Sequence, residues 1–492
     1  MKDKLQRARL FEQKYHPNLS KADQPRFHVT GGVGWINDPN GFSVYQGEYH
    51  LFYQYNPYDT KWGPMHWGHV KTKDFLHWDR LPCALAPDES YDKDGCFSGG
   101  AAELPDGRHL IVYTGVRNVR RSNGMVEGYQ TQCVAVGDGV DYRKISENPV
   151  LDASDVPVGN SHIDFRDPKI WYEDGLFHMV VGNRTADGSG SVLLFESEDG
   201  FRWTYASTLA SCHNQYGKMW ECPDFFALDG RHVLIISAQN MTSMGMEFHP
   251  GNTTFCIIGT YDVDRKHMLR DNTQAIDYGT DFYAAQTIRT LDGRRVMIAW
   301  MQSWESSGCK LKGLPFCGQM TLPRELSIRD GRLIQNPVRE IEQYRAVKVS
   351  YQNVMVTDET SLQGVCGRFL DMTVTVRPGN RNHMYRYFKV NVAKDGERVT
   401  MIRHKPENNT IRVDRSRSGF PHDIVNVRDF PIIPHDELKL RIIMDRYSLE
   451  LFVNDGEQAA SFVLYTPITA DSISFSCDGS AIVDVVKYDL EV

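Results

Sequence analysis

Short apolar runs separated by glycine turns fill the chain from about residue 27 onward. The runs are rich in Val, Ile, Tyr, Phe and Trp, a pattern typical of β-strands. One layout also recurs along the chain: a polar or acidic cluster, a few apolar residues, a turn glycine and then a strongly apolar run. The five apolar runs that follow the turn glycines are 48–53, 108–113, 176–181, 231–236 and 294–299.

The spacing of these units predicts the architecture. Successive turn glycines are 60, 68, 55 and 63 residues apart, and they are Gly47, Gly107, Gly175, Gly230 and Gly293. Each step leaves room for about four strands with their turns. Five such units predict a five-bladed β-propeller over residues 26–330, because radial repetition leaves only short sheet edges. A large β-sandwich is the competing architecture, and it does not predict such a period.

Three further segments complete the expected organisation. Residues 1–25 predict a short lead-in helix, and residues 331–347 predict a capped, helix-like linker. Residues 348–492 alternate apolar and polar positions over many short runs, which predicts an antiparallel β-sandwich. The sandwich region carries no acidic cluster like those upstream. We therefore expect an all-β chain in which the propeller is catalytic and the sandwich is supporting structure.

Composition narrows the possible partners. The net charge of -8 is spread along the chain, which argues against nucleic acid and anionic membranes. No apolar run of about 18 residues is present, so no membrane span is expected. The charged N-terminus lacks the apolar core of a secretory signal, and the ten cysteines form no CxxC pair. These features favour a cytoplasmic protein with reduced thiols.

Three carboxylates occupy related places in the repeat. Asp38 and Glu221 each lie 9 residues before their turn glycine, and Asp167 lies 8 residues before its own. Because the innermost strands of a propeller line one central channel, we expect the three side chains to converge at one equivalent position. Such a cluster is costly unless it is used, since like charges repel and desolvate one another.

The cluster could bind a hard cation or act on a glycoside. Calcium sites usually draw on local Asp-rich loops, whereas these acids are far apart in the sequence. They are also interleaved with Arg166 and with aromatic residues, which suit the faces and hydroxyls of a sugar. We therefore expect a sugar site without a metal. The aromatic residues are Trp35, Trp62, Trp67, Phe97 and Trp220.

A glycosidase needs one ionised carboxylate and one that is kept protonated. Glu221 is flanked by Trp220, Cys222 and Pro223, apolar neighbours that would favour its protonated form. Asp38 precedes Pro-Asn-Gly, which predicts a tight, exposed turn. The sequence therefore favours Glu221 as the acid and Asp38 as the nucleophile.

An ordered set of motifs resembles glycoside hydrolase family 32, the β-fructofuranosidases. The resemblance covers nearly the whole chain from about residue 26. The segments that carry it are Trp35–Gly41 (WINDPNG), Phe52–Pro57, Trp62–Gly63, Trp67–His69, Phe97–Gly99, Arg166–Pro168, Trp220–Pro223 and Asp445–Gly456.

The resemblance implies a role for each matching residue. Asp38 would be the nucleophile, Glu221 the acid/base and Asp167 the stabiliser of the transition state, with Arg166 beside it. A retaining reaction follows, for which the two reacting carboxyl groups lie about 5–5.5 Å apart. No cofactor is implied. The substrate-binding residues would be Asn37, Gln54, Trp62, Phe97, Ser98, Arg166 and Cys222, with Asp281 or Tyr283 further out.

The substrate is less closely defined. Sucrose, sucrose 6-phosphate and short fructo-oligosaccharides all fit a β-fructofuranosidase, and a fructosyltransferase would use the same three acids. A phosphate would need donors at the rim of the site, for which Lys61, Arg117, Arg120 and Arg121 are candidates by charge. Two functions compete with these: an inverting five-bladed glycosidase acting on pentose units, and a lectin that binds fructans.

Overall fold

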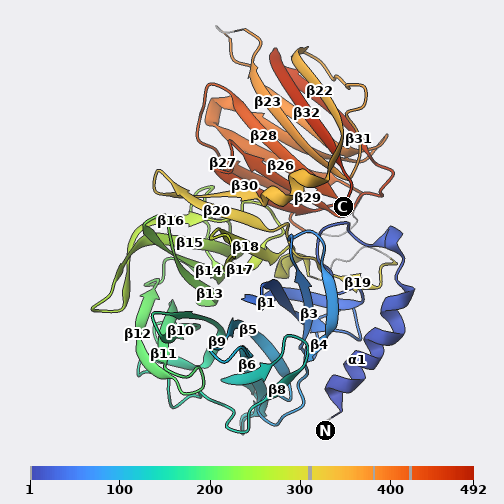
Figure 1. Cartoon of the computed structure of the whole chain (residues 1–492). Coiled ribbons are helices and arrows are strands. Elements are labelled where there is room, and N and C mark those ends of the chain that lie inside the picture. The colour runs from blue at the N-terminus through green and yellow to red at the C-terminus, as the bar shows by residue number, and fades with distance from the viewer. Residues whose placement is uncertain (1–2, 308–312, 381–382, 420–423) are drawn as a thin grey trace.

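The computed structural model describes residues 3–307, 313–380, 383–419 and 424–492 (Figure 1). Near the N-terminus, the predicted lead-in helix is α1 (Lys4–Tyr15), followed by the short 3₁₀ helices η1 (His16–Asn18) and η2 (Lys21–Asp23). Helix α1 packs on strand β4 (Asp79–Leu85). Its buried Glu12 accepts a hydrogen bond of 2.9 Å from the backbone N–H of Cys83. In the described part of the chain, no helix combines the length and the apolar character that a bilayer crossing requires.

Five antiparallel sheets follow the five sequence units in order. The first and second sheets are made by β1 (Gly34–Tyr45), β2 (Glu48–Asn56), β3 (His66–Thr72) and β4, and by β5 (Gly95–Glu103), β6 (His109–Arg120), β7 (Val126–Gly137) and β8 (Tyr142–Lys144). The third sheet is made by β9 (Asn160–Glu173), β10 (Leu176–Thr185), β11 (Gly190–Ser197) and β12 (Thr204–Ser211). The fourth is made by β13 (Met219–Leu228), β14 (Arg231–Met241), β15 (Gly251–Asp262) and β16 (His267–Ala275). The fifth is made by β17 (Tyr283–Arg289), β18 (Arg295–Trp300), β20 (Arg324–Arg329) and β21 (Arg332–Pro337).

The first strand of each sheet faces the centre of a closed ring (Figure 1). Strands β1, β5, β9, β13 and β17 each contact the next one, and β17 contacts β1 to close the circle. The short strand β19 (Phe316–Cys317) adds a parallel pairing to β1. Each predicted turn glycine has a positive φ between 76° and 88°, as a tight hairpin turn requires. The sheets are therefore arranged as a β-propeller, as the repeat predicted.

The boundary between the propeller and the sandwich differs from the expected one. The fifth sheet continues to Pro337, because Asp330 and Gly331 both have positive φ and form a two-residue turn between β20 and β21. A 3₁₀ helix, η4 (Arg339–Tyr344), follows, and β22 begins at Arg345. The connector is thus shorter than the predicted 331–347 linker.

The C-terminal region is the predicted sandwich, drawn in orange and red in Figure 1. One sheet has the order β22-β32-β23-β28-β29-β30 and the other the order β27-β26-β25-β24-β31. The strands are β22 (Arg345–Val356), β23 (Leu370–Pro378), β24 (Tyr387–Lys394), β25 (Val399–Lys405), β26 (Thr410–Arg417), β27 (Val427–Pro431), β28 (Leu438–Asp445), β29 (Ser448–Val453), β30 (Gln458–Val463), β31 (Ser472–Asp478) and β32 (Ala481–Leu490), with η5 (Pro406–Asn408) between β25 and β26.

Buried ion pairs join the propeller to the sandwich. His28 contacts Asp445 and Glu450 of the sandwich, each at 2.9 Å. Arg324 of β20 pairs with Glu450 at 2.6 Å and with Asp277 at 2.9 Å. All of these side chains are almost fully removed from solvent. Because the contacts of His28 with Asp445 and Glu450 and of Arg324 with Glu450 cross between the domains, separating the domains would leave buried charges without these partners.

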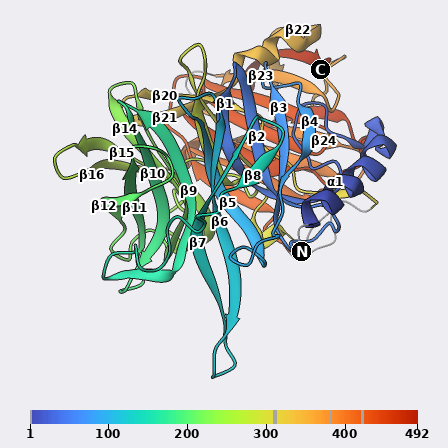
Figure 2. The ribbon, with the colours of Figure 1, turned by 60° about the horizontal axis from the view of Figure 1, so that its bottom comes forward.

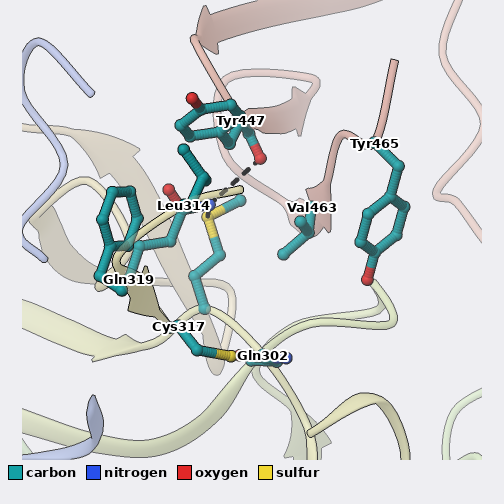
Figure 3. A pocket seen from close by; sticks show the side chains of 10 residues that line it. Gln302, Leu314, Cys317, Gln319, Tyr447, Val463 and Tyr465 are labelled. Carbon is teal, nitrogen blue, oxygen red and sulfur yellow. Dashed lines mark hydrogen bonds between the residues drawn. The ribbon is translucent and has the colours of Figure 1, made fainter. Parts of the chain in front are cut away.

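A small pocket lies at the same interface (Figure 3). It is lined by propeller residues around β19 and by Tyr447, Val463 and Tyr465 of the sandwich. The side-chain amide of Gln319 donates a hydrogen bond of 3.1 Å to the backbone oxygen of Tyr447 across it. The free thiols are those of Cys83, Cys96, Cys133, Cys212, Cys222, Cys256, Cys366 and Cys477, and Cys309 lies outside the described residues.

His28 makes the stability of the protein pH-dependent. Burial alone would lower the pKa of His28, but the hydrogen bonds to Asp445 and Glu450 outweigh it and raise this pKa from 6.5 to about 9. The contribution of His28 to stability is therefore complete below about pH 6.5 and is lost as the pH rises through about 9. We expect the His28→Gln variant to lack this dependence, which amounts to about 3 kcal/mol of unfolding free energy.

Urea denaturation of both proteins at pH 6.5, 8 and 9.5 measures the difference. The comparison with the variant removes the contribution of other groups that titrate in the same range. Parallel pH curves for the two proteins would contradict the prediction.

Candidate active site

Each inner strand of the propeller carries a β-bulge in its N-terminal half. The register shifts lie between Ile36 and Pro39, Phe97 and Gly99, Arg166 and Lys169, Glu221 and Asp224, and Tyr283 and Gln286. Asp167, Cys222 and Ala284 adopt positive φ within these bulges. A bulge re-aims the side chains beside it, so the five bulges together direct side chains towards one end of the central channel.

The three predicted acids meet at these bulges, but not at one equivalent position. Glu221 is the last paired residue before its bulge, and Asp167 is the first residue inside its own. Asp38 is the last residue of the bulge in β1 and is half-buried. The exposed turn expected at Asp38 is therefore wrong: Pro39 and Asn40 pair with β2, so Asp-Pro-Asn-Gly continues a strand.

Asp38 is held by two side-chain donors. The hydroxyl of Ser98 donates to its Oδ2 at 2.7 Å, and the amide of Asn37 donates to its Oδ1 at 3.1 Å. Asn37 is itself fixed by the indole N–H of Trp35 at 2.8 Å. Burial and the nearby Glu221 raise the pKa of Asp38 to about 6, while its hydrogen bonds oppose that rise. Asp38 is thus mainly ionised at neutral pH and has a fixed orientation.

Asp167 and Asp38 are linked through Cys222. The Cys222 thiol lies 3.7 Å from an oxygen of each carboxylate, and its backbone N–H donates to Asp167 at 3.1 Å. The backbone N–H of Asp167 donates to the hydroxyl of Thr114 at 3.0 Å. Burial, Glu221 and Asp38 raise the pKa of Asp167 to about 7, against the opposing effect of Arg166. Cys222 thus lies between two carboxylates as a positioning neighbour.

Polar groups surround the carboxylate of Glu221, in place of the expected apolar ones. Arg166 Nε donates to one of its oxygens at 2.9 Å, and the hydroxyl of Tyr283 donates to the other at 2.7 Å. Arg166 is in turn held by Asp164 at 3.1 Å and by Gln130 at 3.3 Å. Asp164 and Gln130 escaped the sequence analysis, although Asp164 lies on the same strand two residues before Arg166.

Aromatic side chains pack around the acids. Trp35 contacts Trp300 at a ring distance of 5.8 Å and stacks on Trp304 at 6.5 Å. Trp62 is 48% exposed and meets the half-buried Phe97 edge-on at 6.0 Å. The accessible rings of Trp62 and Phe97 suit a sugar, whereas Trp35 and Trp300 are almost fully buried. The sequence analysis identified Trp35, Trp62 and Phe97 but missed Trp300 and Trp304, which come from the fifth unit.

Gln54 contacts the strand that carries Phe97, one of these aromatic residues. It is buried in β2, and its amide donates to the backbone oxygen of Cys96 at 2.9 Å, next to Phe97. This contact fixes the strand that carries Phe97 and Ser98.

Asp281 does not belong to the cluster. It is fully buried and pairs with Arg415 of the sandwich at 2.7 Å. It also accepts hydrogen bonds from Ser306 at 3.1 Å and from the backbone N–H of Val463 at 3.0 Å. The expectation that Asp281 contacts substrate is therefore wrong, because its oxygens join the two domains instead.

The basic candidates at the rim lie mainly on the β6–β7 hairpin, which extends away from the body of the protein (Figure 2). Arg121 pairs with Glu127 at 2.6 Å, and the Arg117 guanidinium lies over the ring of Tyr129 at 5.4 Å. Lys61 and Arg120 are exposed. Within the described ranges, no three His, Cys, Asp or Glu side chains are grouped in a way that could hold a metal ion.

Comparisons with known proteins identify the family of the chain. The model of the glycosyl hydrolases family 32 N-terminal domain matches residues 28–337, and that of the family 32 C-terminal domain matches residues 340–490. The chain is 35% identical over 485 residues to a sucrose-6-phosphate hydrolase of Zymomonas mobilis, covering 95% of this chain and 92% of that protein. It is also 35% identical over 491 residues to a raffinose invertase of Escherichia coli, covering 98% of both.

A solved structure is similar over the same extent. The Bombyx mori family 32 β-fructofuranosidase is 32% identical, with a TM-score of 0.84 over 99% of this chain and 98% of that one. A mutant of the same enzyme was solved in complex with sucrose. Since both domain models match and together cover most of the chain, the protein belongs to glycosyl hydrolase family 32.

Proposed function

We propose that the protein is a retaining β-fructofuranosidase that releases fructose from sucrose-type β-D-fructofuranosides. The single observation that carries this proposal is that Asp38 and Glu221 lie in one cluster and are held by different hydrogen-bond donors. Asp38 accepts hydrogen bonds from Ser98 and Asn37, which favour an anion. Family membership and the sugars named for the relatives, among them sucrose in the Bombyx mori complex, support the same reaction.

In the first step, an ionised oxygen of Asp38 attacks C2 of the fructosyl unit, and the bond from C2 to the leaving oxygen breaks. Glu221 gives its proton to that oxygen, which leaves as the hydroxyl of the second sugar. Arg166 and Tyr283 hold both oxygens of Glu221 in place for this transfer. In the second step, Glu221 takes a proton from water, and the resulting hydroxide attacks C2 and frees Asp38.

Asp167 acts through the sugar ring. It is buried beside Asp38, and the N–H of Cys222 orients it towards the same space. A carboxylate in this place accepts hydrogen bonds from ring hydroxyls and stabilises the positive charge that develops at C2. The ring stacks against the accessible aromatic surface of Trp62 and Phe97.

The charge of Asp38 lowers the stability of the folded protein. The pKa of Asp38 rises from 3.8 to about 6, so its charge costs folding free energy that grows between these pH values and is complete above about pH 6. We expect Asp38→Asn to lower kcat at least about a thousandfold and to raise unfolding free energy at pH 7 by about 3 kcal/mol. The stability gain should vanish near pH 4. Glu221→Gln should lower kcat to a similar extent and also remain folded.

Asp224→Asn is the matched control, because Asp224 pairs with the buried Lys169 at 3.6 Å instead of joining the three acids. Its removal leaves a buried cation uncompensated and should destabilise the protein. Denaturation curves and sucrose turnover of the variants test both effects. Near-normal turnover in Glu221→Gln would overturn the acid/base assignment.

Ser98 tunes the nucleophile. Its hydroxyl stabilises the Asp38 anion, so Ser98→Ala should raise the pKa of Asp38 further above 6. The acidic limb of the kcat/KM profile should then move to higher pH by about one unit. Ser43→Ala is the control, since Ser43 also lies on the inner surface but bonds to Gly41 and His109. An unmoved acidic limb in Ser98→Ala would show that Asp38 does not govern it.

The stereochemistry of the product tests the reaction class. With sucrose as substrate and methanol present, a retaining enzyme releases β-fructofuranose first and forms the methyl β-fructofuranoside. Proton NMR during the first turnovers distinguishes these β-products from the α-product that an inverting enzyme would release. Parallel assays of sucrose 6-phosphate and a short inulin-type oligosaccharide define the leaving group. No fructose from any of the three would refute the proposal.

A further inference from the structure

A large cavity lies at the opposite end of the propeller channel from the acids. All five inner strands contribute to it through the residues that follow their bulges: 42–44, 101–103, 169–173, 224–228 and 287–289. The turn residues 229, 230 and 293 and Arg295 of β18 complete the lining. We call this space the far-mouth cavity. The proposed reaction makes no use of it.

Two cations, Lys169 and Arg295, and one buried carboxylate, Asp224, line the far-mouth cavity. The buried Lys169 Nζ donates to the backbone oxygen of Thr287 at 2.8 Å and lies 3.6 Å from Asp224 Oδ2. The same oxygen of Asp224 accepts the backbone N–H of Thr287 at 2.6 Å. Both contacts use Oδ2 of Asp224, so this oxygen is engaged by Lys169 and by the backbone of Thr287.

Arg295 is the second cation. Its Nη1 donates to the hydroxyl of Thr287 at 3.3 Å, and its guanidinium lies 4.4 Å from the centre of the Phe226 ring. Among the described residues, no carboxylate lies within ion-pair distance of it. Burial is the main cause that lowers the pKa of both Arg295 and Lys169. Arg295 is half-buried, the charges of Asp224 and Glu173 act on it from beyond ion-pair distance, and its guanidinium presents donors to the cavity.

Three of the four acidic residues of the lining are exposed, and the fourth is the buried Asp224. Glu103, Glu173 and Asp229 are exposed, and each accepts a hydrogen bond from the protein. Their charges are screened by solvent more strongly than that of the buried Lys169, while Arg295 is half-buried. The interior of the cavity therefore has an excess of positive charge.

The far-mouth cavity and the acids are connected through shared strands. Lys169 is the first paired residue after the bulge that holds Asp167, and Asp224 is the first paired residue after the bulge that follows Glu221. A ligand that draws Lys169 away from Asp224 would act on the two strands that position these acids.

We propose that the far-mouth cavity binds a phosphate group, with Arg295 and Lys169 as its donors, and that its occupancy alters the rate of sugar hydrolysis at the other end of the channel. The planar guanidinium suits two oxygens of one phosphate, and the ammonium of Lys169 supplies a point charge. The phosphate could be inorganic or belong to a sugar phosphate, because both present the same oxygens.

Calorimetric titration of the full-length protein with inorganic phosphate and, separately, with glucose 6-phosphate tests binding, with chloride at equal ionic strength as the reference. We expect at least one of them to bind, and Arg295→Gln to weaken that binding by about tenfold or more. The one that binds identifies the source of the phosphate. Arg202→Gln, which alters a side chain that is 92% exposed and not part of the lining, should bind as the parent does.

Arg295→Lys provides a second variant if Arg295→Gln folds poorly, since it keeps the charge and loses the planar fork; it should also weaken binding. No binding of either compound at millimolar concentration, or equal affinity in the parent and a folded Arg295 variant, would overturn the site. This readout does not depend on the proposed sugar chemistry.

Sucrose turnover tests the coupling, which does rest on the proposed function. The bound phosphate compound should change kcat in the parent and not in the Arg295 variant. Purely competitive inhibition that persists unchanged in the variant would place the anion in the sugar site and overturn the proposal.

Discussion

The closure of the ring by β17 on β1 is the constraint on which the rest of the structure depends. An open row of sheets could let its inner strands separate and relieve the repulsion among Asp38, Asp167 and Glu221. A closed ring cannot, because each inner strand is confined by two neighbours. Hydrogen bonding within each sheet and apolar packing between sheets thus supply the free energy that keeps three carboxylates together.

Within this frame, the acids are distinguished by their partners and not by the hydrophobicity of their surroundings. Asp38 has a hydroxyl and an amide as donors, Asp167 has a backbone N–H, and Glu221 has a guanidinium and a phenol. The donors come from all five inner strands. Each sheet therefore contributes a part that has no use alone, and the proposed division of labour follows from their sum.

The sequence predicted the features that repeat and missed those that depend on long-range contacts. The turn glycines marked the hairpins correctly, because their positive φ is a local requirement. Asp38 was expected on an exposed turn, since nothing in Asp-Pro-Asn-Gly reveals that β2 will pair with it. Asp281 was expected near the substrate. Its actual partner, Arg415, lies 134 residues further along the chain, and a local sequence pattern does not reveal so distant a contact. Trp300 and Trp304 join the aromatic residues around the acids only after the ring has closed.

The charged interface has a consequence for the independence of the two domains. Family models divide the chain near residue 338, yet Arg324 and Asp277 on one side and Glu450 on the other form a single buried network. His28 and Asp281 extend it. An isolated propeller would expose side chains that are buried in the whole protein, and it would lack the charged partners that the sandwich supplies to them. The two family domains therefore share one set of buried ion pairs, and a chimera with a relative would need to exchange both halves of this network together.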